Sequence, residues 1–237
     1  MSLSGQDLPV RSIPFLENAP QIDGDLSEWK EKAFHDGFWD LNRVKVSAWY
    51  EPKRNRLNID SLEDTNAIDL TARYYMAWDQ SYLYFGAEVQ DNLHDVTESN
   101  HEPKRWYYKD AIAFFFEVPR DSIPERFGEG DHAFCFVSDT LRPDYGAWWR
   151  HGNVEQSYIE EPLPFDAVDY HIKMNPWDRS SADYILEARV NMNATFGSGN
   201  DDWTKPQVGD VLSMMIVHCD PDGGEYGGHL LIYGKGD

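Results

Sequence analysis

Apolar residues recur at every second position along much of this chain, which is the pattern of a half-buried β-strand. In the segment SYLYFGAEV, each alternate residue from Leu83 to Val89 is apolar. The segment LTARYYMAW precedes it, and the short WDQS sequence between the two favours a hairpin turn. The two segments therefore predict a pair of antiparallel strands.

Similar short segments continue towards the C-terminus and are separated by turn residues. The segments are DAIAFFFEVP, HAFCFVS, VDYHIKMN, DYILEARVNM, VLSMMIVHC and HLLIYG. The turn residues between them include Pro-Asp, Gly-Glu-Gly, Asn-Pro and Asp-Gly-Gly. Many short strands with such punctuation are typical of a sandwich or a barrel. The sequence predicts an all-β fold, an antiparallel β-sandwich of jelly-roll type with long loops and one or two short helices.

Helical and irregular segments are fewer. Asp25 followed by Glu28 predicts the cap of a short helix that runs to Ala33, and MNATF is expected to form one turn. VKVSAWY is the strand predicted within residues 36–69, while residues 140–165 are expected to form a loop. Loops of that length in a compact domain are usually functional or disordered.

No internal repeat or long linker divides the sequence, which predicts a single domain. We expect this domain to span residues 10–237, and residues 1–9, MSLSGQDLP, to be an N-terminal tail that is either native or introduced. The tail has no export-signal pattern, and we expect that a native signal has been removed. No apolar run approaches the roughly 18 residues of a membrane span.

Charge and aromatic content narrow the functional classes. The formal net charge is −21, from 42 acidic and 21 basic residues, so phosphate backbones and anionic lipid surfaces would be repelled. We therefore expect neither nucleic-acid binding nor membrane insertion. The 9 Trp, 13 Tyr and 12 Phe residues suit both a packed sheet and a surface that stacks on flat ligands.

The two cysteines, Cys135 and Cys219, both lie in apolar, strand-like segments. No CxxC motif or Cys/His cluster accompanies them, which argues against a zinc site. We expect buried free thiols, although a disulfide is left open because it depends on the distance between the two Cα atoms.

Four segments follow one another along the chain, and together they span residues 22–234: IDGDLSEW, AWDQSYLYFGAEVQD, RWYYKDAIAFFFE and GGHLLIYG. Their order resembles that of family 9 carbohydrate-binding modules. The resemblance implies an antiparallel β-sandwich that binds glycans without catalysis and takes part in polysaccharide breakdown or sensing. It also implies bound calcium and an extracellular or periplasmic location, because such modules are attached to secreted glycan-degrading enzymes.

In the family, two aromatic side chains clamp a sugar ring. The resemblance places one wall of the clamp at Trp106 or Tyr107, shortly before Asp110. The other wall is a Trp before the last strand, and the nearest aromatic residue here is Tyr226.

Two polar positions of the family pattern are apolar in this chain. Ala113 replaces an acidic residue, and Cys135 lies where a basic residue is common. Any sugar site is therefore expected to be partly rebuilt, with Trp148 and Trp149 as candidate replacements. Only one of these two neighbours faces outward if they lie on a strand.

Acidic residues near two strand ends offer a candidate metal site. Asp91 and Asp95 follow one apolar strand, and Asp110 precedes the next. Calcium takes six to eight oxygen ligands, which carboxylates, carbonyls and water supply. The alternative is that these side chains cap turns through hydrogen bonds to the backbone.

The alternatives to glycan binding are a glycoside hydrolase or hydrolase-associated domain, and a haem-binding electron-transfer domain. A glycoside hydrolase needs two carboxylates across a sugar cleft, but with 42 acidic residues the sequence singles out no pair and we predict no catalytic residues. A haem-binding electron-transfer domain would need Met and His axial ligands. The candidates for that role are Met76, Met174, Met214, Met215, His132, His171 and His218. The particular glycan and the oligomeric state are not predicted.

Overall fold

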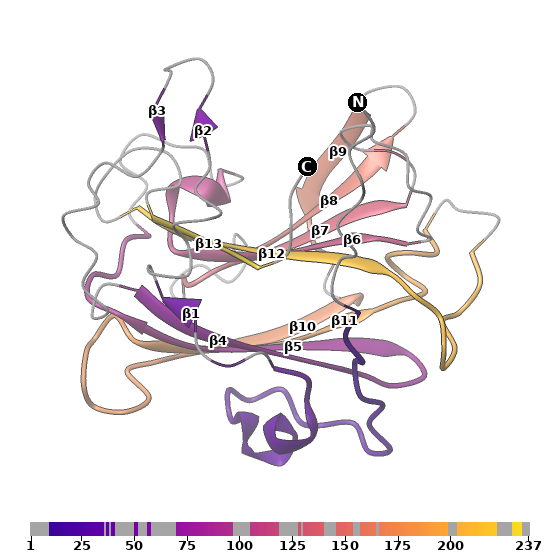
Figure 1. The fold of residues 1–237 in the computed structure, drawn as a ribbon, viewed down its shortest axis with the longest axis horizontal. Coiled ribbons are helices and arrows are strands. Elements are labelled where there is room, and N and C mark those ends of the chain that lie inside the picture. The colour runs from indigo at the N-terminus through magenta and orange to yellow at the C-terminus, as the bar shows by residue number, and fades with distance from the viewer. Residues whose placement is uncertain are drawn as a thin grey trace.

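The computed structural model gives two antiparallel sheets packed face to face (Figure 1). The structure describes residues 10–35, 37, 39–40, 50–51, 56–57, 70–96, 105–118, 128, 130–139, 146–153, 157–164, 166–198, 203–221 and 229–233. The predicted β-sandwich is confirmed.

The first sheet has five strands in the order β1-β4-β5-β11-β10. Their bounds are Trp39–Asp40 (β1), Leu70–Trp78 (β4), Tyr82–Asp91 (β5), Tyr184–Asn191 (β11) and Val168–Met174 (β10). Strands β4 and β5 form the predicted hairpin, in which Trp78 pairs with Leu83 and Leu70 pairs with Asp91.

The second sheet has six strands in the order β13-β12-β6-β7-β8-β9. Their bounds are His229–Tyr233 (β13), Ser213–Asp220 (β12), Ala111–Glu117 (β6), Asp131–Val137 (β7), Ala147–Asn153 (β8) and Ser157–Pro162 (β9). A separate two-stranded ribbon pairs Tyr50–Glu51 (β2) with Arg56–Leu57 (β3). Of the predicted strand VKVSAWY, only Tyr50 lies within the described residues.

The prediction of a loop over residues 140–165 is wrong, because β8 and β9 lie there as an antiparallel pair at the edge of the six-stranded sheet. Gly152 in β8 and Pro162 at the end of β9 obscured the strand pattern. A proline is tolerated there because an edge strand need not donate every backbone hydrogen bond.

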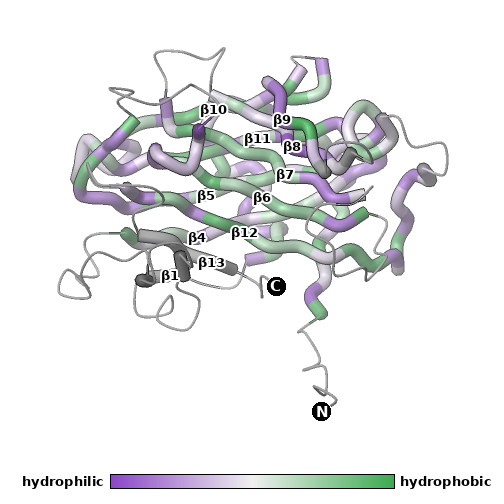
Figure 2. The backbone as a smooth tube through the Cα atoms, turned by 90° about the horizontal axis from the view of Figure 1, so that it is seen from above, coloured by the Kyte–Doolittle hydropathy of each residue, from purple (hydrophilic) through white to green (hydrophobic). Residues whose placement is uncertain are grey.

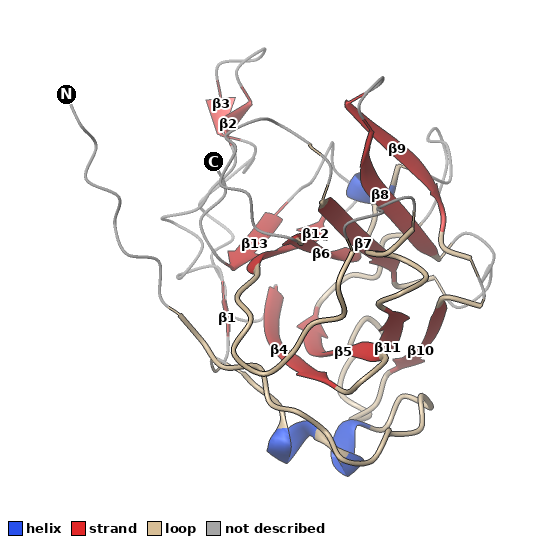
Figure 3. Ribbon diagram, turned by 90° about the vertical axis from the view of Figure 1, so that its right-hand side faces the viewer, coloured by secondary structure: helices blue, strands red, loops and turns tan. Residues whose placement is uncertain are grey.

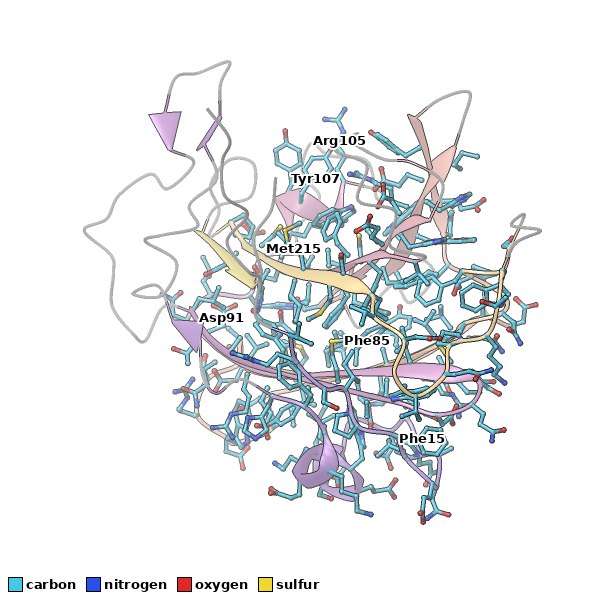
Figure 4. All side chains as sticks on the ribbon, turned by 45° about the vertical axis from the view of Figure 1, so that its right-hand side comes forward. Phe15, Phe85, Asp91, Arg105, Tyr107 and Met215 are labelled. Carbon is cyan, nitrogen blue, oxygen red and sulfur yellow. The ribbon has the colours of Figure 1, made fainter. Side chains whose placement is uncertain are left out.

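Aromatic side chains fill the space between the two sheets. Phe85 from β5 stacks on Phe114 from β6, with ring centroids 4.4 Å apart. Phe116, Phe134 and Phe136 surround the same ring, and all are buried. Figure 4 shows Phe85 between the sheets, and Figure 2 shows hydrophobic positions along the central strands with hydrophilic ones at many turns.

Both cysteines are buried free thiols, as expected. Cys135 lies on β7 and Cys219 on β12, and β6 runs between these two strands. Burial raises the pKa of each thiol, because the thiolate loses its hydration in the interior.

The predicted helix from Asp25 to Ala33 is replaced by two single 3₁₀ turns, Leu26–Glu28 (η1) and Lys30–Lys32 (η2). Asp25 caps the first turn by accepting a hydrogen bond from the Ser27 N–H at 2.9 Å. Glu28 does not complete a capping box, because its carboxylate accepts the Gln21 N–H instead. Residues 192–196 form a turn, as expected.

The segment that contains these turns lies on the outer face of the five-stranded sheet, where Figure 3 shows both short helices in blue. Glu187 of β11 holds it there, although its side chain points away from the main core. Its carboxylate accepts hydrogen bonds from the Trp29 indole N–H at 2.7 Å and from the N–H groups of Gly24 and Asp23 at 2.8 and 3.0 Å. Gly24 has a φ of +81°, and a Cβ there would lie 2.6 Å from the His171 ring. The IDGDLSEW motif is thus a structural element that binds one buried carboxylate.

Replacing Glu187 with Gln should lower the free energy of unfolding by about 1.5–3 kcal/mol, as for loss of hydrogen bonds to a charged group. The carboxamide has one acceptor oxygen for donors that now reach both carboxylate oxygens. Urea unfolding of the variant would measure the change, with Glu31→Gln on the exposed surface as the matched control. Equal stability of Glu187→Gln and the parent would contradict this account.

Candidate functional site

The outer face of the six-stranded sheet carries the residues that the sequence singled out for sugar binding. Side chains alternate along β6, β7 and β8, so the neighbours of each core residue point to this face. Ala113, Cys135 and Trp148 lie in one row across these three strands, and Phe115, Ala133 and Arg150 lie in the next. Figure 4 shows Met215, Tyr107 and Arg105 on this side of the sheet, away from Phe85.

Trp106 covers the centre of this face. It begins the 3₁₀ turn Trp106–Tyr108 (η4), which precedes β6, and it joins a buried apolar cluster. The cluster comprises Trp106, Ala111, Ala113, Ala133, Cys135, Val137, Trp148 and Cys219. The indole N–H donates to Glu160 Oε1 at 3.0 Å. Only 4% of Trp106 is exposed, so its buried ring supports neighbouring residues and presents little surface to solvent.

Tyr107 lies next to Trp106 and is only half-buried. Its ring meets that of Trp106 edge to face, with centroids 5.4 Å apart, and its centroid lies 5.1 Å from that of the Tyr108 ring. Burial raises the pKa of the Tyr107 hydroxyl, which keeps that group protonated at neutral pH. Tyr107 is therefore a partly exposed aromatic residue on this face.

Trp148 and Trp149 point to opposite faces of β8. Trp148 pairs with Cys135 on the outer face, but it belongs to the apolar cluster there and only 7% of it is exposed. Trp149 packs in the core between the sheets and donates its indole N–H to His132 Nδ1 at 3.2 Å. The structure thus brings Trp148 to the candidate face and Trp149 to the core.

Ala113 and Cys135 are direct cross-strand partners. These are the two positions at which the family resemblance predicts polar groups. Both are fully buried in the cluster beneath Trp106. Small apolar side chains at this pair allow the indole ring to lie close to the sheet. Tyr226 lies outside the described residues.

Sequence reasoning missed a charged group at the β8–β9 edge. Arg150 and Glu160 are paired in register and form an ion pair, with Arg150 Nη2 3.1 Å from Glu160 Oε1. The Arg150 guanidinium also lies over the Tyr158 ring, 4.5 Å from its centroid. Once β8 is assigned as a strand, its two-residue period puts Arg150 on the same face as Trp148.

Three carboxylates gather where both sheets end. Asp91 at the end of β5, Asp110 just before β6 and Asp220 at the end of β12 each offer an oxygen, and these oxygens lie within 4.8 Å of one another. All three residues are at most 2% exposed. Figure 4 labels Asp91 at this end of the sandwich.

Asp95 is not a member of this group. Its backbone N–H donates to Asp110 Oδ2 at 2.6 Å, so it organises the loop before Asp110 through its main chain. The sequence did not indicate Asp220 as a member of the group, because it is distant in sequence from Asp91 and Asp110. The antiparallel pairing of β12 with β6 sets Cys219 opposite Ala111 and so brings Asp220 to Asp110. Clustered carboxylate oxygens from both sheets fit a hard cation such as calcium, because they supply the oxygen ligands and negative charge that it prefers.

Three of the seven residues named as candidates for haem ligation have other partners. His218 lies buried between the hydroxyl groups of Tyr74 and Tyr184, each 2.9 Å from one ring nitrogen. His132 accepts from Trp149, and Met76 packs in the core. These contacts give the three side chains structural roles.

The arrangement defines a β-sandwich binding module with an aromatic and charged surface on one sheet. The sequence matches the family model described as carbohydrate family 9 binding domain-like over residues 44–232. The chain belongs to this family, and the resemblance inferred from its four segments is confirmed. No functionally curated protein matches the sequence.

Solved structures support the same fold. A family 9 carbohydrate-binding module from Caldicellulosiruptor kristjanssonii has been solved with cellotriose and with glucose, and each is 14% identical to this chain. Their TM-scores are 0.51 and 0.52, with 89% of this chain and 77% and 78% of those chains covered. A putative carbohydrate-binding protein from Bacteroides uniformis gives a TM-score of 0.53 at 9% identity, covering 94% of this chain and 88% of that one.

The described residues include no helix with the length and apolar character needed to cross a membrane.

The burial of His132 predicts a pH-dependent stability. Burial lowers the pKa of His132 from its ordinary value of 6.5 to about 3, and the neighbouring His151 adds to the effect. Because the unfolded chain binds the proton more readily, stability is retained above pH 6.5 and is lost as pH falls towards 3. Over this window, protonation linked to His132 should lower the free energy of unfolding by about 1.4 kcal/mol for each unit by which the pH falls.

Urea unfolding between pH 4 and pH 7 would test this contribution. His132→Gln retains an acceptor for Trp149 but removes the titrating ring, so its stability should fall less steeply with acid than that of the parent. His171→Gln, on the exposed surface of β10, controls for loss of a histidine. The same pH slope in His132→Gln and the parent would show that His132 does not cause the effect.

Proposed function

We propose that this chain is a non-catalytic module that binds glycans on the outer face of its six-stranded sheet, beside η4. The observation that carries the proposal is the half-buried Tyr107 ring, held against the buried Trp106. Arg150 and Glu160 lie on the same face and reach the Trp106 ring and its N–H, respectively. An apolar ring beside convergent polar groups is the minimal chemistry for sugar recognition.

Membership of the family supports a role in polysaccharide breakdown or sensing outside the cytoplasm. The related structures solved with cellotriose and glucose make β-glucan oligosaccharides the first ligands to test. The net charge of −21 argues against nucleic acid as a partner, since phosphates would be repelled.

A calcium ion held by Asp91, Asp110 and Asp220 is part of this proposal. Three buried carboxylates within 4.8 Å repel one another unless a cation or protons neutralise them. When bound, calcium would supply the positive charge between the ends of the two sheets. Asp91 belongs to the five-stranded sheet, whereas Asp110 and Asp220 adjoin the six-stranded sheet. The proposed role is therefore structural.

Removing the Tyr107 ring should weaken glycan binding without unfolding the protein. If a sugar face covers this ring, Tyr107→Ala should cost about 1–3 kcal/mol of binding free energy. Calorimetric titration with cellotriose, glucose and soluble xylan would measure it. Trp177→Ala is the matched control, because Trp177 is 40% exposed and lies in the β10–β11 turn of the other sheet.

Trp149→Ala separates packing from binding. It should lower the unfolding free energy by about 3–5 kcal/mol, because the ring fills the core.

Failure of the parent to bind any member of a broad glycan panel would count against the proposed function. Unchanged glycan affinity in a folded Tyr107→Ala variant would move the site away from η4.

Calcium should raise the melting temperature of the parent protein. Binding to the native state contributes about 2.7 kcal/mol at a hundredfold excess over the dissociation constant. Asp220→Asn should abolish the response, and in EDTA this variant should melt at or above the parent because one repulsive charge is gone. Asp166→Asn, on the exposed surface, should respond to calcium like the parent. Equal melting of the parent in EDTA and in millimolar calcium would exclude an exchangeable site.

A further inference from the structure

The side chain of Arg105 differs from the other charged groups beside Tyr107, because its charge is not balanced by a neighbour. Arg105 is the residue before η4 and is partly exposed. Among the described residues, no ion-pair or hydrogen-bond partner reaches its guanidinium. Arg150 on the same face is instead paired with Glu160 at 3.1 Å. The guanidinium of Arg105 is therefore available to an anionic group of a ligand.

The backbone of η4 keeps Arg105 and Tyr107 close together. The Tyr108 N–H donates to the Arg105 carbonyl oxygen and the Lys109 N–H donates to that of Trp106, both at 3.1 Å. The buried Trp106 ring anchors the same turn to the sheet. Figure 4 shows the side chains of Arg105 and Tyr107 on the same side of the molecule, away from the core. Because one anchored turn carries both groups, less backbone entropy is lost when a ligand binds them.

The charges nearest to Tyr107 are positive on balance. Burial raises the pKa of the Tyr107 hydroxyl, and Arg105 is the charged group that opposes this rise most. Arg150 acts in the same sense as Arg105, whereas Glu160 acts in the opposite sense. Charges more than about 8 Å away are largely screened at physiological ionic strength. For a small ligand these near neighbours therefore outweigh the net charge of −21, which is spread over the whole chain.

A sugar that carries one carboxylate suits this arrangement. In a uronic acid of the gluco configuration the ring substituents are equatorial, so C–H groups line both faces and the carboxylate projects from the edge of the ring. When one face rests on the Tyr107 ring, the carboxylate therefore extends sideways towards a neighbouring side chain. A planar guanidinium binds such a group through two parallel N–H···O hydrogen bonds.

We infer that Arg105 makes this face a site for glycans that carry isolated uronic acid residues on an otherwise neutral chain. The inference rests on the proposed glycan-binding function and names its ligand class. Arg105 binds the carboxylate, while the Tyr107 ring contacts the apolar face of the same sugar. Continuous polyuronates are disfavoured, because Arg150 is already paired with Glu160 and a polyanion is repelled by the net charge of −21.

Cellotriose and its C6-oxidised derivatives are suitable probes, because they differ only in the number and place of carboxylates. The set comprises cellotriose, the two isomers oxidised at one terminal glucose, and the fully oxidised trisaccharide. In calorimetric titrations the parent should bind one of the singly oxidised isomers about tenfold more tightly than cellotriose, as for one charge-assisted pair. It should bind the fully oxidised ligand less tightly than that isomer. About 1 M salt should reduce the preference, because it shortens the screening length to about 3 Å.

Arg105→Gln removes the charge but retains N–H donors, so this variant should bind the preferred isomer and cellotriose with similar affinity. Arg105→Lys keeps the charge without the planar fork of donors and should retain part of the preference. Arg11→Gln is the matched control, because Arg11 is exposed and lies near Ile13, whose carbonyl oxygen accepts from Trp78 of the five-stranded sheet. This control should keep the preference of the parent despite the same change in net charge. Melting temperatures would verify that each variant is folded.

The outcomes separate the two proposals. If the parent binds cellotriose at least as tightly as both singly oxidised isomers, the preference for uronic acids is wrong while glycan binding stands. A preference that survives in Arg105→Gln would overturn the role of Arg105, because another group would then bind the carboxylate. Tightest binding of the fully oxidised ligand would overturn the restriction to isolated uronic acids. Absence of binding to all these ligands and to a broad glycan panel would overturn the proposed function and this inference together.

Discussion

The packing of Phe85 against Phe114 joins the two sheets and fixes which face of the six-stranded sheet is the core. Once Phe114 points inward, the alternation of side chains places Ala113 and Phe115 on the outer face. The pairing of β6 with β7 and of β7 with β8 then determines which residues of those strands lie on the same outer face. A shift of one residue in any of these strands would exchange core and site. The aromatic core and the candidate sugar surface are therefore specified by the same register.

Buried carboxylates are accommodated in different ways in this fold. Glu187 accepts three N–H donors from the segment that it holds. Asp183 receives two donors from Arg179 and one from the Asp91 backbone. The group that includes Asp91 instead brings like charges together from both sheets. The first two arrangements can be complete within the protein, whereas the third is the one that a bound cation would complete.

Much of the fold could be predicted from local pattern, because a two-residue apolar period and turn residues identify strands without knowledge of their partners. The sequence could not predict which of Trp148 and Trp149 points into the core. Side chains alternate along a strand, so either orientation is possible until β8 is paired with β7. The ion pair of Arg150 with Glu160 depends on a hairpin whose Gly and Pro concealed it. Asp220 could not be predicted as a member of the carboxylate group, because only the pairing of β12 with β6 brings it to Asp110.

The burial of Trp106 changes how this face can recognise a sugar. Its N–H is engaged by Glu160 and its ring rests on small side chains such as Ala113 and Cys135, so the indole is fixed from below and from its edge. It contributes support, and Tyr107 contributes a partly exposed ring. Because Trp106 is buried, a larger share of the discrimination between ligands falls to hydrogen bonding. Hydrogen bonds from restrained charged groups depend steeply on ligand stereochemistry and charge, whereas stacking on a ring tolerates many sugars.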